Sequence, residues 1–147
     1  MEGKGDGKWW LHVSVADEAN TVKYYRVQTK GEHGSFERMV VNDDGTISIV
    51  TKNSNLNVSA ETAEHAEYFM QKKGEGSYII EFEVDSWFHD MIMEYAIPQK
   101  KYRTNLLNQG RTAPKIVDPH QPGLYLELPP VWLDWIEEIA KNAKTLE

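Results

Sequence analysis

A glutamate on a short strand-like segment is the strongest candidate for chemistry in this 147-residue chain. Side chains alternate between faces along a strand, so in segment 123–128 the three leucines share one face and leave Tyr125 and Glu127 together on the other. A carboxylate beside an aromatic ring can project into a cleft and stabilise a developing positive charge. The alternative is a solvated glutamate on a half-buried strand.

Two earlier polar residues form an ordered set with this glutamate. Arg26 lies in a predicted strand at 22–28, and Ser59 lies where a strand-like segment runs into a predicted helix. A guanidinium offers a rigid fork of donors that suits phosphate or ribose oxygens. Ser59 has two compatible roles, either holding the strand geometry near the carboxylate or capping the helix.

Three tyrosines lie beside these polar residues and are candidates to stack on a planar ring. Tyr24 shares a face of the predicted strand with Arg26, whereas Tyr25 points to the opposite face. Tyr125 precedes Glu127 by two residues. Packing in the core is the alternative for two of the three.

The charge of the chain is uneven. Residues 59–98 hold nine acidic residues against two lysines, which accounts for the whole formal net charge of -7. Residues 99–117 contain no acid and five cations, which are Lys100, Lys101, Arg103, Arg111 and Lys115. Because the connection from 99 to 122 is longer than a compact domain needs, it is a candidate anion-binding loop. The alternative is a solvated basic loop that keeps the surface of the protein mixed in sign.

Other kinds of site have little support in the sequence. There is no cysteine, which excludes disulfides and cysteine-ligated metals, and the five histidines lack metal-binding spacing, so no metal is expected. Glycine-rich phosphate loops and nucleophile-elbow motifs are also missing. No apolar run is long enough to span a bilayer, and we expect no membrane partner.

The expected elements make one domain of the α+β class, residues 9–147, after a flexible leader at 1–8. Strand patterns are predicted at 9–15, 22–28, 39–41, 46–50, 77–84, 115–117 and 123–128. Helices are predicted from Ser59 to Lys73, from 85 or 86 to Pro98, and after Pro129-Pro130, the last with Val131, Trp135, Ile136 and Ile139 inward. The final Leu146-Glu147 are given no structural weight.

The ordered arginine, serine and glutamate resemble the Arg–Ser–Glu arrangement of the ADP-ribosyltransferase fold, a core of mostly antiparallel strands with two to three helices. Short segments more narrowly resemble C-terminal toxin domains of Rhs-type and contact-dependent inhibition proteins of bacteria. These segments are Tyr25-Arg26-Val27-Gln28, Ala96-Ile97-Pro98-Gln99, Asn108-Gln109-Gly110, Ala113-Pro114-Lys115-Ile116-Val117-Asp118 and Glu127-Leu128-Pro129, and the resemblance covers residues 22 to 143.

The resemblance implies an NAD-dependent mono-ADP-ribosyltransferase toxin domain, released from a larger secreted effector and acting in the cytoplasm of a competitor cell. NAD would be its substrate, and a cognate immunity protein its partner. Glu127 would be catalytic, with Arg26, Tyr24, Tyr25, Ser59 and Tyr125 on NAD and the five loop cations on the acceptor.

One departure from the family concerns the acceptor. The family's protein-arginine modifiers carry a second acid or a glutamine where this chain has Tyr125. A structured RNA or a translation-related protein is therefore the expected acceptor. Two alternatives stay open, a metal-independent toxin ribonuclease that uses His120, Glu127 and Lys115, and a non-enzymatic immunity or binding module.

Overall fold

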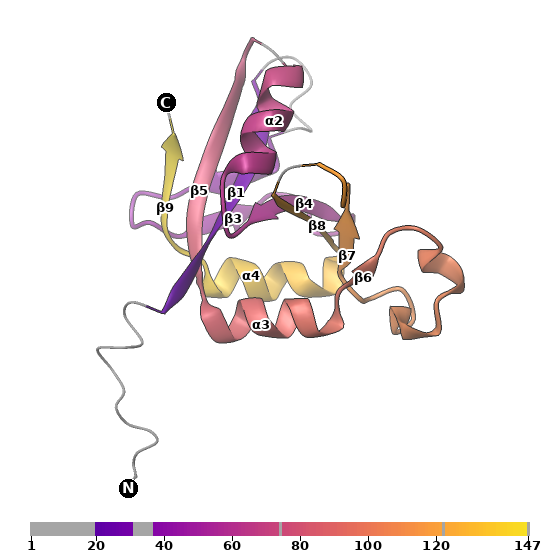
Figure 1. Cartoon of the computed structure of the whole chain (residues 1–147). Helices are drawn as coiled ribbons and strands as arrows, with labels where there is room; N and C mark the ends of the chain where they lie inside the picture. Colours follow the sequence, from indigo (N-terminus) through magenta and orange to yellow (C-terminus); the bar gives the residue numbers. More distant parts are fainter. Residues whose placement is uncertain (1–19, 31–36, 74, 122, 147) are drawn as a thin grey trace, which may run out of the picture.

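The computed structural model describes residues 20–30, 37–73, 75–121 and 123–146 (Figure 1). The expected leader and the expected strand at 9–15 lie outside them. The strands are β1 (Thr21–Thr29), β2 (Met39–Val41), β3 (Ile47–Ile49), β4 (Leu56–Ala60), β5 (Ser77–Asp85), β6 (Ile97–Pro98), β7 (Lys115–Val117), β8 (Leu124–Leu128) and β9 (Lys141–Leu146). The helices are α2 (Glu64–Lys73), α3 (Ser86–Tyr95) and α4 (Leu133–Ile139), with 3-10 turns η3 (Tyr102–Thr104), η4 (Leu106–Asn108) and η5 (Pro130–Trp132).

The predicted α+β class with mostly antiparallel strands is confirmed. In the described ranges, seven strands form one sheet in the order β6-β7-β8-β4-β1-β5-β9, and β2 and β3 form a separate hairpin. Neighbouring strands of the large sheet are antiparallel except for the parallel pair β6 and β7. The hairpin turns at Gly45, whose φ of 86° suits a residue without a Cβ atom.

The middle of the large sheet is held together by a short ladder. Strands β1 and β4 pair only at Tyr24↔Ala60 and Tyr25↔Ser59, whereas β1 pairs with β5 along its whole length. Beyond Tyr25 the two central strands separate, β1 staying with β5 and β4 staying with β8. The sheet is therefore split at its centre.

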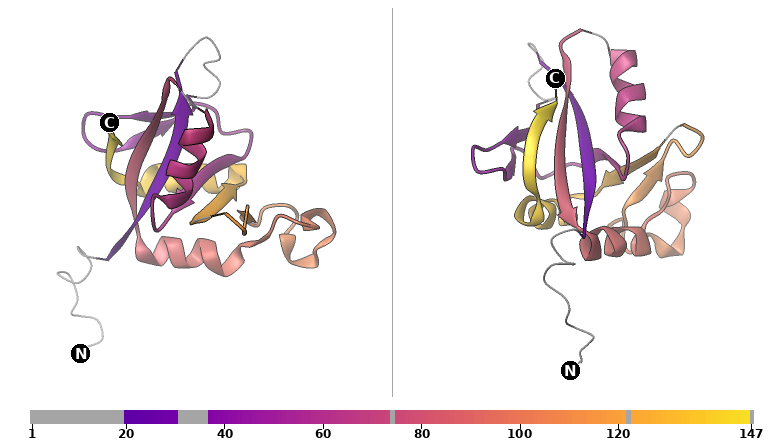
Figure 2. Two further views of the ribbon diagram at one scale, coloured as in Figure 1. Left: turned by 45° about the horizontal axis from the view of Figure 1, so that its top comes forward. Right: turned by 60° about the vertical axis from the view of Figure 1, so that its left-hand side comes forward.

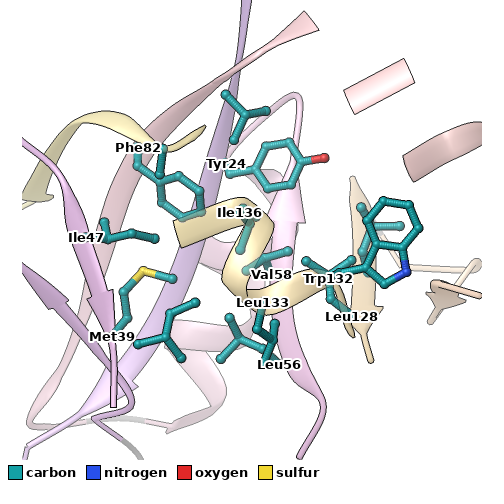
Figure 3. Close-up of a cluster of buried hydrophobic side chains, with 14 of the residues drawn as sticks. Tyr24, Met39, Ile47, Leu56, Val58, Phe82, Leu128, Trp132, Leu133 and Ile136 are labelled. Carbon is teal, nitrogen blue, oxygen red and sulfur yellow. The ribbon is translucent and has the colours of Figure 1, made fainter. Parts of the chain in front are cut away.

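One face of the sheet packs on α3 and α4, which lie side by side below it in Figure 1. Alternation along β5 sends Ile80, Phe82 and Val84 into this layer, as the sequence predicts. Figure 3 shows Leu133 and Ile136 of α4 among buried side chains from the strands. This layer is the main hydrophobic core.

The opposite face carries α2 (Figure 2). Ala66 of α2 is buried in a smaller cluster with Tyr25 and Ile79, and Met70 packs against that cluster. Because one helix covers part of this face, polar side chains of the central strands have space beside it. The candidate site lies here.

Three sequence-based expectations about elements are wrong. Ser59 does not begin a helix, because it is paired with Tyr25 on one side and Tyr125 on the other, and α2 starts only at Glu64. Val131 and Trp135 are 61% and 41% exposed and do not face inward, whereas Ile136 is fully buried and Ile139 packs against the core, as predicted. The chain end is also structured, since Leu146 closes β9 and pairs with Ile79.

Candidate functional site

A pocket of about 280 Å³ occupies the central split on the α2 face of the sheet. It brings together four residues predicted from the sequence, which are Tyr25, Arg26, Ser59 and Tyr125. The other lining residues are Val27, Thr29, Asn57 and Phe69. Its walls come from β1, β4, β8 and α2, so residues that are far apart in the chain meet because their strands are neighbours.

Arg26 lies where β1 and β4 separate. Its Nη1 donates to the Asn57 carbonyl at 2.9 Å, and its Nε donates to Gln28 Oε1 at 2.9 Å. Burial, and secondly the nearby charge of Arg38, lowers the pKa of Arg26 to about 10. The guanidinium thus remains charged at neutral pH and occupies the place of the missing ladder bonds, facing the pocket.

Tyr125 forms an aromatic wall of the pocket. Its ring stacks on His65 with the ring centres 3.9 Å apart and the planes 14° apart. His65 in turn lies 3.3 Å from the Asp118 carboxylate through Nε2. Burial raises the pKa of the Tyr125 hydroxyl, against opposing effects of Arg26 and of a hydrogen bond from Asn57. The hydroxyl is therefore neutral and firmly placed.

The position of Tyr125 depends on a close approach between β8 and α2. Gly123 precedes β8 with a φ of 81°, and a Cβ atom there would lie 2.8 Å from the backbone nitrogen of His65. Only glycine fits that contact. The approach brings His65 under the Tyr125 ring.

Ser59 and Tyr25 are directly opposite each other on the central ladder. Ser59 is buried among strands and lines the pocket, so it is a strand residue and its role as a helix cap is excluded. The hydroxyl of Tyr25 has a raised pKa, first through burial and then through Glu81. Both side chains line the pocket.

Glu127 lies next to the pocket but does not line it. It is opposite Asn57 in the β4–β8 ladder and two residues along β8 from Tyr125. Its side chain is 17% exposed, accepts a short hydrogen bond from Asn55 Nδ2, and lies 3.3 Å from Lys115 Nζ. The opposite face of β8 is apolar as predicted, since Leu126 and Leu128 are fully buried. Glu127 is thus a partly buried, paired carboxylate.

Tyr24 lies outside the pocket. It is 0% exposed, belongs to the main core, and its hydroxyl is 2.7 Å from His89 Nδ1. The expectation that Tyr24 shares a ligand-facing surface with Arg26 is therefore wrong. The Arg26 side chain reaches the pocket because the sheet splits beside it, which strand alternation alone does not predict.

The basic loop divides into two parts. Lys100, Lys101, Arg103 and Arg111 are exposed. Lys115 instead lies in β7, pairs with Glu127 and has its Nζ 4.5 Å from the centre of the Tyr102 ring. Lys115 therefore joins the base of the loop to the candidate carboxylate and is not a free surface cation.

Several residues near the site escaped the sequence reasoning. Asn57 lies two residues before Ser59 on β4 and therefore on the same face, a pattern from which the sequence could have predicted it. Asn55 donates a hydrogen bond to Glu127. Phe69 and His65 come from α2, and only the three-dimensional packing of that helix on the sheet brings them to the pocket.

Within the residues that the structure describes, no helix is both long and apolar enough to cross a membrane. Across the same residues, no cluster of three or more histidine, aspartate or glutamate side chains could hold a metal ion. His120 lines a separate hollow of about 370 Å³ with Gln99 and Lys100. No family model, curated protein or solved structure matches this chain.

Proposed function

We propose that this chain is an NAD-dependent mono-ADP-ribosyltransferase toxin domain with an ADP-ribosyltransferase-like fold. The observation that carries the proposal is the meeting of Arg26, Ser59 and Tyr125 in one pocket at the split of the sheet, with Glu127 beside it on β8. The ordered trio of the sequence therefore corresponds to three adjacent strands.

The chemistry required is cleavage of the bond between nicotinamide and ribose. Nicotinamide leaves with the bonding electrons, C1 of the ribose becomes electron-poor, and a nucleophile of the acceptor bonds to it and loses a proton. Hydrogen bonding to the ribose 2-hydroxyl and a nearby negative charge both stabilise such an oxocarbenium-like state. Glu127 supplies a carboxylate for both purposes.

The pocket offers partners for the remainder of the dinucleotide. Arg26 presents a charged, partly buried guanidinium that suits a phosphate or a ribose oxygen. Tyr125 and Phe69 provide aromatic surface, their ring centres 5.9 Å apart. Ser59 stabilises β4, the strand between β1 and β8. Tyr25 also lines the pocket, whereas Tyr24 only supports the fold from the core.

The exposed loop cations Lys100, Lys101, Arg103 and Arg111 are proposed to bind an anionic acceptor, RNA or a translation-related protein. Lys115 is reassigned to hold Glu127. The resemblance to bacterial toxin domains supports three further parts of the proposal. These are delivery by a larger effector, action in the target-cell cytoplasm and inhibition by an immunity protein.

The test is incubation of the domain with NAD labelled in its adenylate part and a bacterial lysate. Label should move to a macromolecule while nicotinamide is released, and Glu127→Gln should abolish both. Nuclease and protease treatment then identifies the acceptor class. Intact NAD after incubation with lysate from a susceptible species would overturn the proposal.

The ribonuclease alternative has less support, because His120 lines a different hollow from the one beside Glu127. It predicts RNA cleavage without NAD. The binding-module alternative predicts inertness in both assays, so the same experiment separates the three.

A further inference from the structure

The loop between β6 and β7, residues 99–114, exposes two adjacent leucines. Leu106 is 97% exposed and Leu107 is 63% exposed, and both belong to the turn η4. Figure 1 shows the loop projecting from the β6–β7 end of the sheet, beyond the helices. Leucines this exposed add little to the stability of the fold. Their position therefore calls for a contact outside it.

The leucines are held in place by an ordered loop. Asn105 accepts a hydrogen bond from the Leu107 amide at 2.8 Å, and Asn108 Nδ2 donates to the Tyr102 carbonyl at 2.9 Å. The Tyr102 hydroxyl donates to the Ala113 carbonyl at 2.6 Å. Because the tip is ordered in advance, binding through it costs less conformational entropy.

The charges around the leucines have one sign. Residues 99–117 contain no acid, and Lys100, Lys101, Arg103 and Arg111 are all exposed. Lys115, the remaining cation, is engaged with Glu127. The tip is therefore an apolar point with cations before and after it, on a chain whose formal net charge is -7.

We propose that this loop binds anionic lipid surfaces, with Leu106 and Leu107 entering the boundary between headgroups and acyl chains and the four exposed cations contacting lipid phosphates. The sequence predicts no membrane partner because no apolar run could span a bilayer. Entry of two side chains needs no such run. The contact is weak, reversible and sensitive to salt. It does not need the pocket, but it uses the same four cations that are proposed to bind the acceptor, so lipid and acceptor compete for them.

The two exposed leucines favour lipid as the group that the tip of the loop contacts, because neither RNA nor a protein partner accounts for them. Single-stranded RNA is bound largely by stacking its bases on aromatic rings, and the one aromatic residue of the loop, Tyr102, is buried. Protein interfaces are depleted in lysine, and their strongest contacts are rich in tryptophan and tyrosine. The exposed pair Leu106 and Leu107 fits neither pattern, whereas an apolar tip between cations fits a deformable negative surface.

The test is sedimentation of the full chain with phosphatidylcholine vesicles and with vesicles in which part of the lipid is phosphatidylserine. Only the second kind should bind the protein, and salt should release it. Leu106→Ser with Leu107→Ser should lower partitioning by about tenfold, while Val131→Ser, an exposed apolar residue outside the loop, should not. Lys100→Glu with Lys101→Glu should abolish binding.

Retention of unstructured RNA on a filter, measured for the same variants, separates the competing partner. RNA binding that needs the cations but not the leucines, together with absence from the vesicle pellet, would overturn the proposal. Vesicle binding that is unchanged in the leucine variant would also overturn it. Matching thermal unfolding midpoints guard against a folding defect, since both leucines are exposed.

Discussion

The pocket and the basic loop are built in opposite ways. The pocket is lined by residues from β1, β4, β8 and α2, which meet only when the sheet has formed. The loop is ordered mainly by hydrogen bonds among its own residues, between 99 and 114. Changes in the pocket should therefore affect stability and activity together, whereas changes on the loop surface should affect contacts alone.

The two regions meet at one pair. Lys115 contacts Glu127 on one side and the Tyr102 ring on the other. A change at Tyr102 or Lys115 should therefore alter the position or the ion pairing of the Glu127 carboxylate. The tip and the exposed cations are outside that connection.

The largest expected effect is on catalysis. Glu127→Gln should lower the rate of nicotinamide release by about a hundredfold or more, because it removes the charge that stabilises the transition state. Glu127 and Lys115 are mostly buried, so the loss of their pair should also lower the free energy of unfolding by about 1–3 kcal/mol. Released nicotinamide measures the first quantity and thermal unfolding the second.

The matched control for this change is Glu83→Gln. Glu83 lies on β5, away from the pocket, and accepts from the Thr21 hydroxyl at 2.9 Å. Its variant should keep full activity. Equal losses in the two variants would contradict the assignment of Glu127.

Arg26→Ala tests the claim that pocket residues also support the fold. It removes the donor to the Asn57 carbonyl and one of the two donors to Gln28 Oε1, the other being the Met39 amide. The loss should lower the free energy of unfolding by about 1–3 kcal/mol. It should also weaken NAD binding. Urea unfolding and a binding titration measure the two effects, with Arg26→Lys as a variant that keeps the charge but not the fork. An unchanged affinity would remove Arg26 from the site.

Charge reversal tests the other side of the comparison. Lys100→Glu, Lys101→Glu and Arg103→Glu together should leave NAD cleavage intact, since these side chains are exposed. Transfer of label to the acceptor in a lysate cleared of membranes should fall about tenfold or more. Loss of both activities, or of neither, would contradict the assignment of the loop to acceptor binding.

The smallest expected effect is on alkaline stability. Burial, and secondly Glu61, raises the pKa of Tyr24 far above its ordinary value of 10.0. Above pH 10 the unfolded chain releases this proton while the folded chain keeps it, so unfolding becomes easier as pH rises, by about 1.4 kcal/mol per pH unit. Tyr24→Phe should remove the contribution of Tyr24 to that slope, which urea titrations at several pH values measure.

Tyr102→Phe provides the comparison within the loop. Burial also raises the pKa of Tyr102, but this side chain is less completely buried than Tyr24, at 6% exposed against 0%. Its variant should therefore change the alkaline slope less than Tyr24→Phe does. Equal changes would show that the two tyrosines are equally shielded.

Local patterns predicted much of this architecture from the sequence. Alternation identified the buried faces of β5 and β8, and the strand patterns at 39–41 and 46–50 identified β2 and β3. The split between β1 and β4 could not be predicted, because it depends on which strands pair and where their ladder ends. For the same reason the sequence wrongly predicted that Tyr24 faces the site together with Arg26.

The end of the chain was missed for a different reason. Strand β9 is an edge strand with mostly exposed side chains, so it lacks the alternation by which buried strands are detected. The start of α2 was placed too early because Ser59 and the acids after it match a helix cap. Its two ladder partners outweigh that local preference.

The pairing of β9 with β5 has a consequence for how the chain folds. Ile79 pairs with Leu146 across a long separation in sequence, so this edge of the sheet closes only after β9 is available. Until then β5 presents an unpaired edge, which is a template for association with other chains. Non-local closure of this kind also slows folding. During folding the chain is therefore most prone to associate with other chains just before residues 141–146 pair with β5.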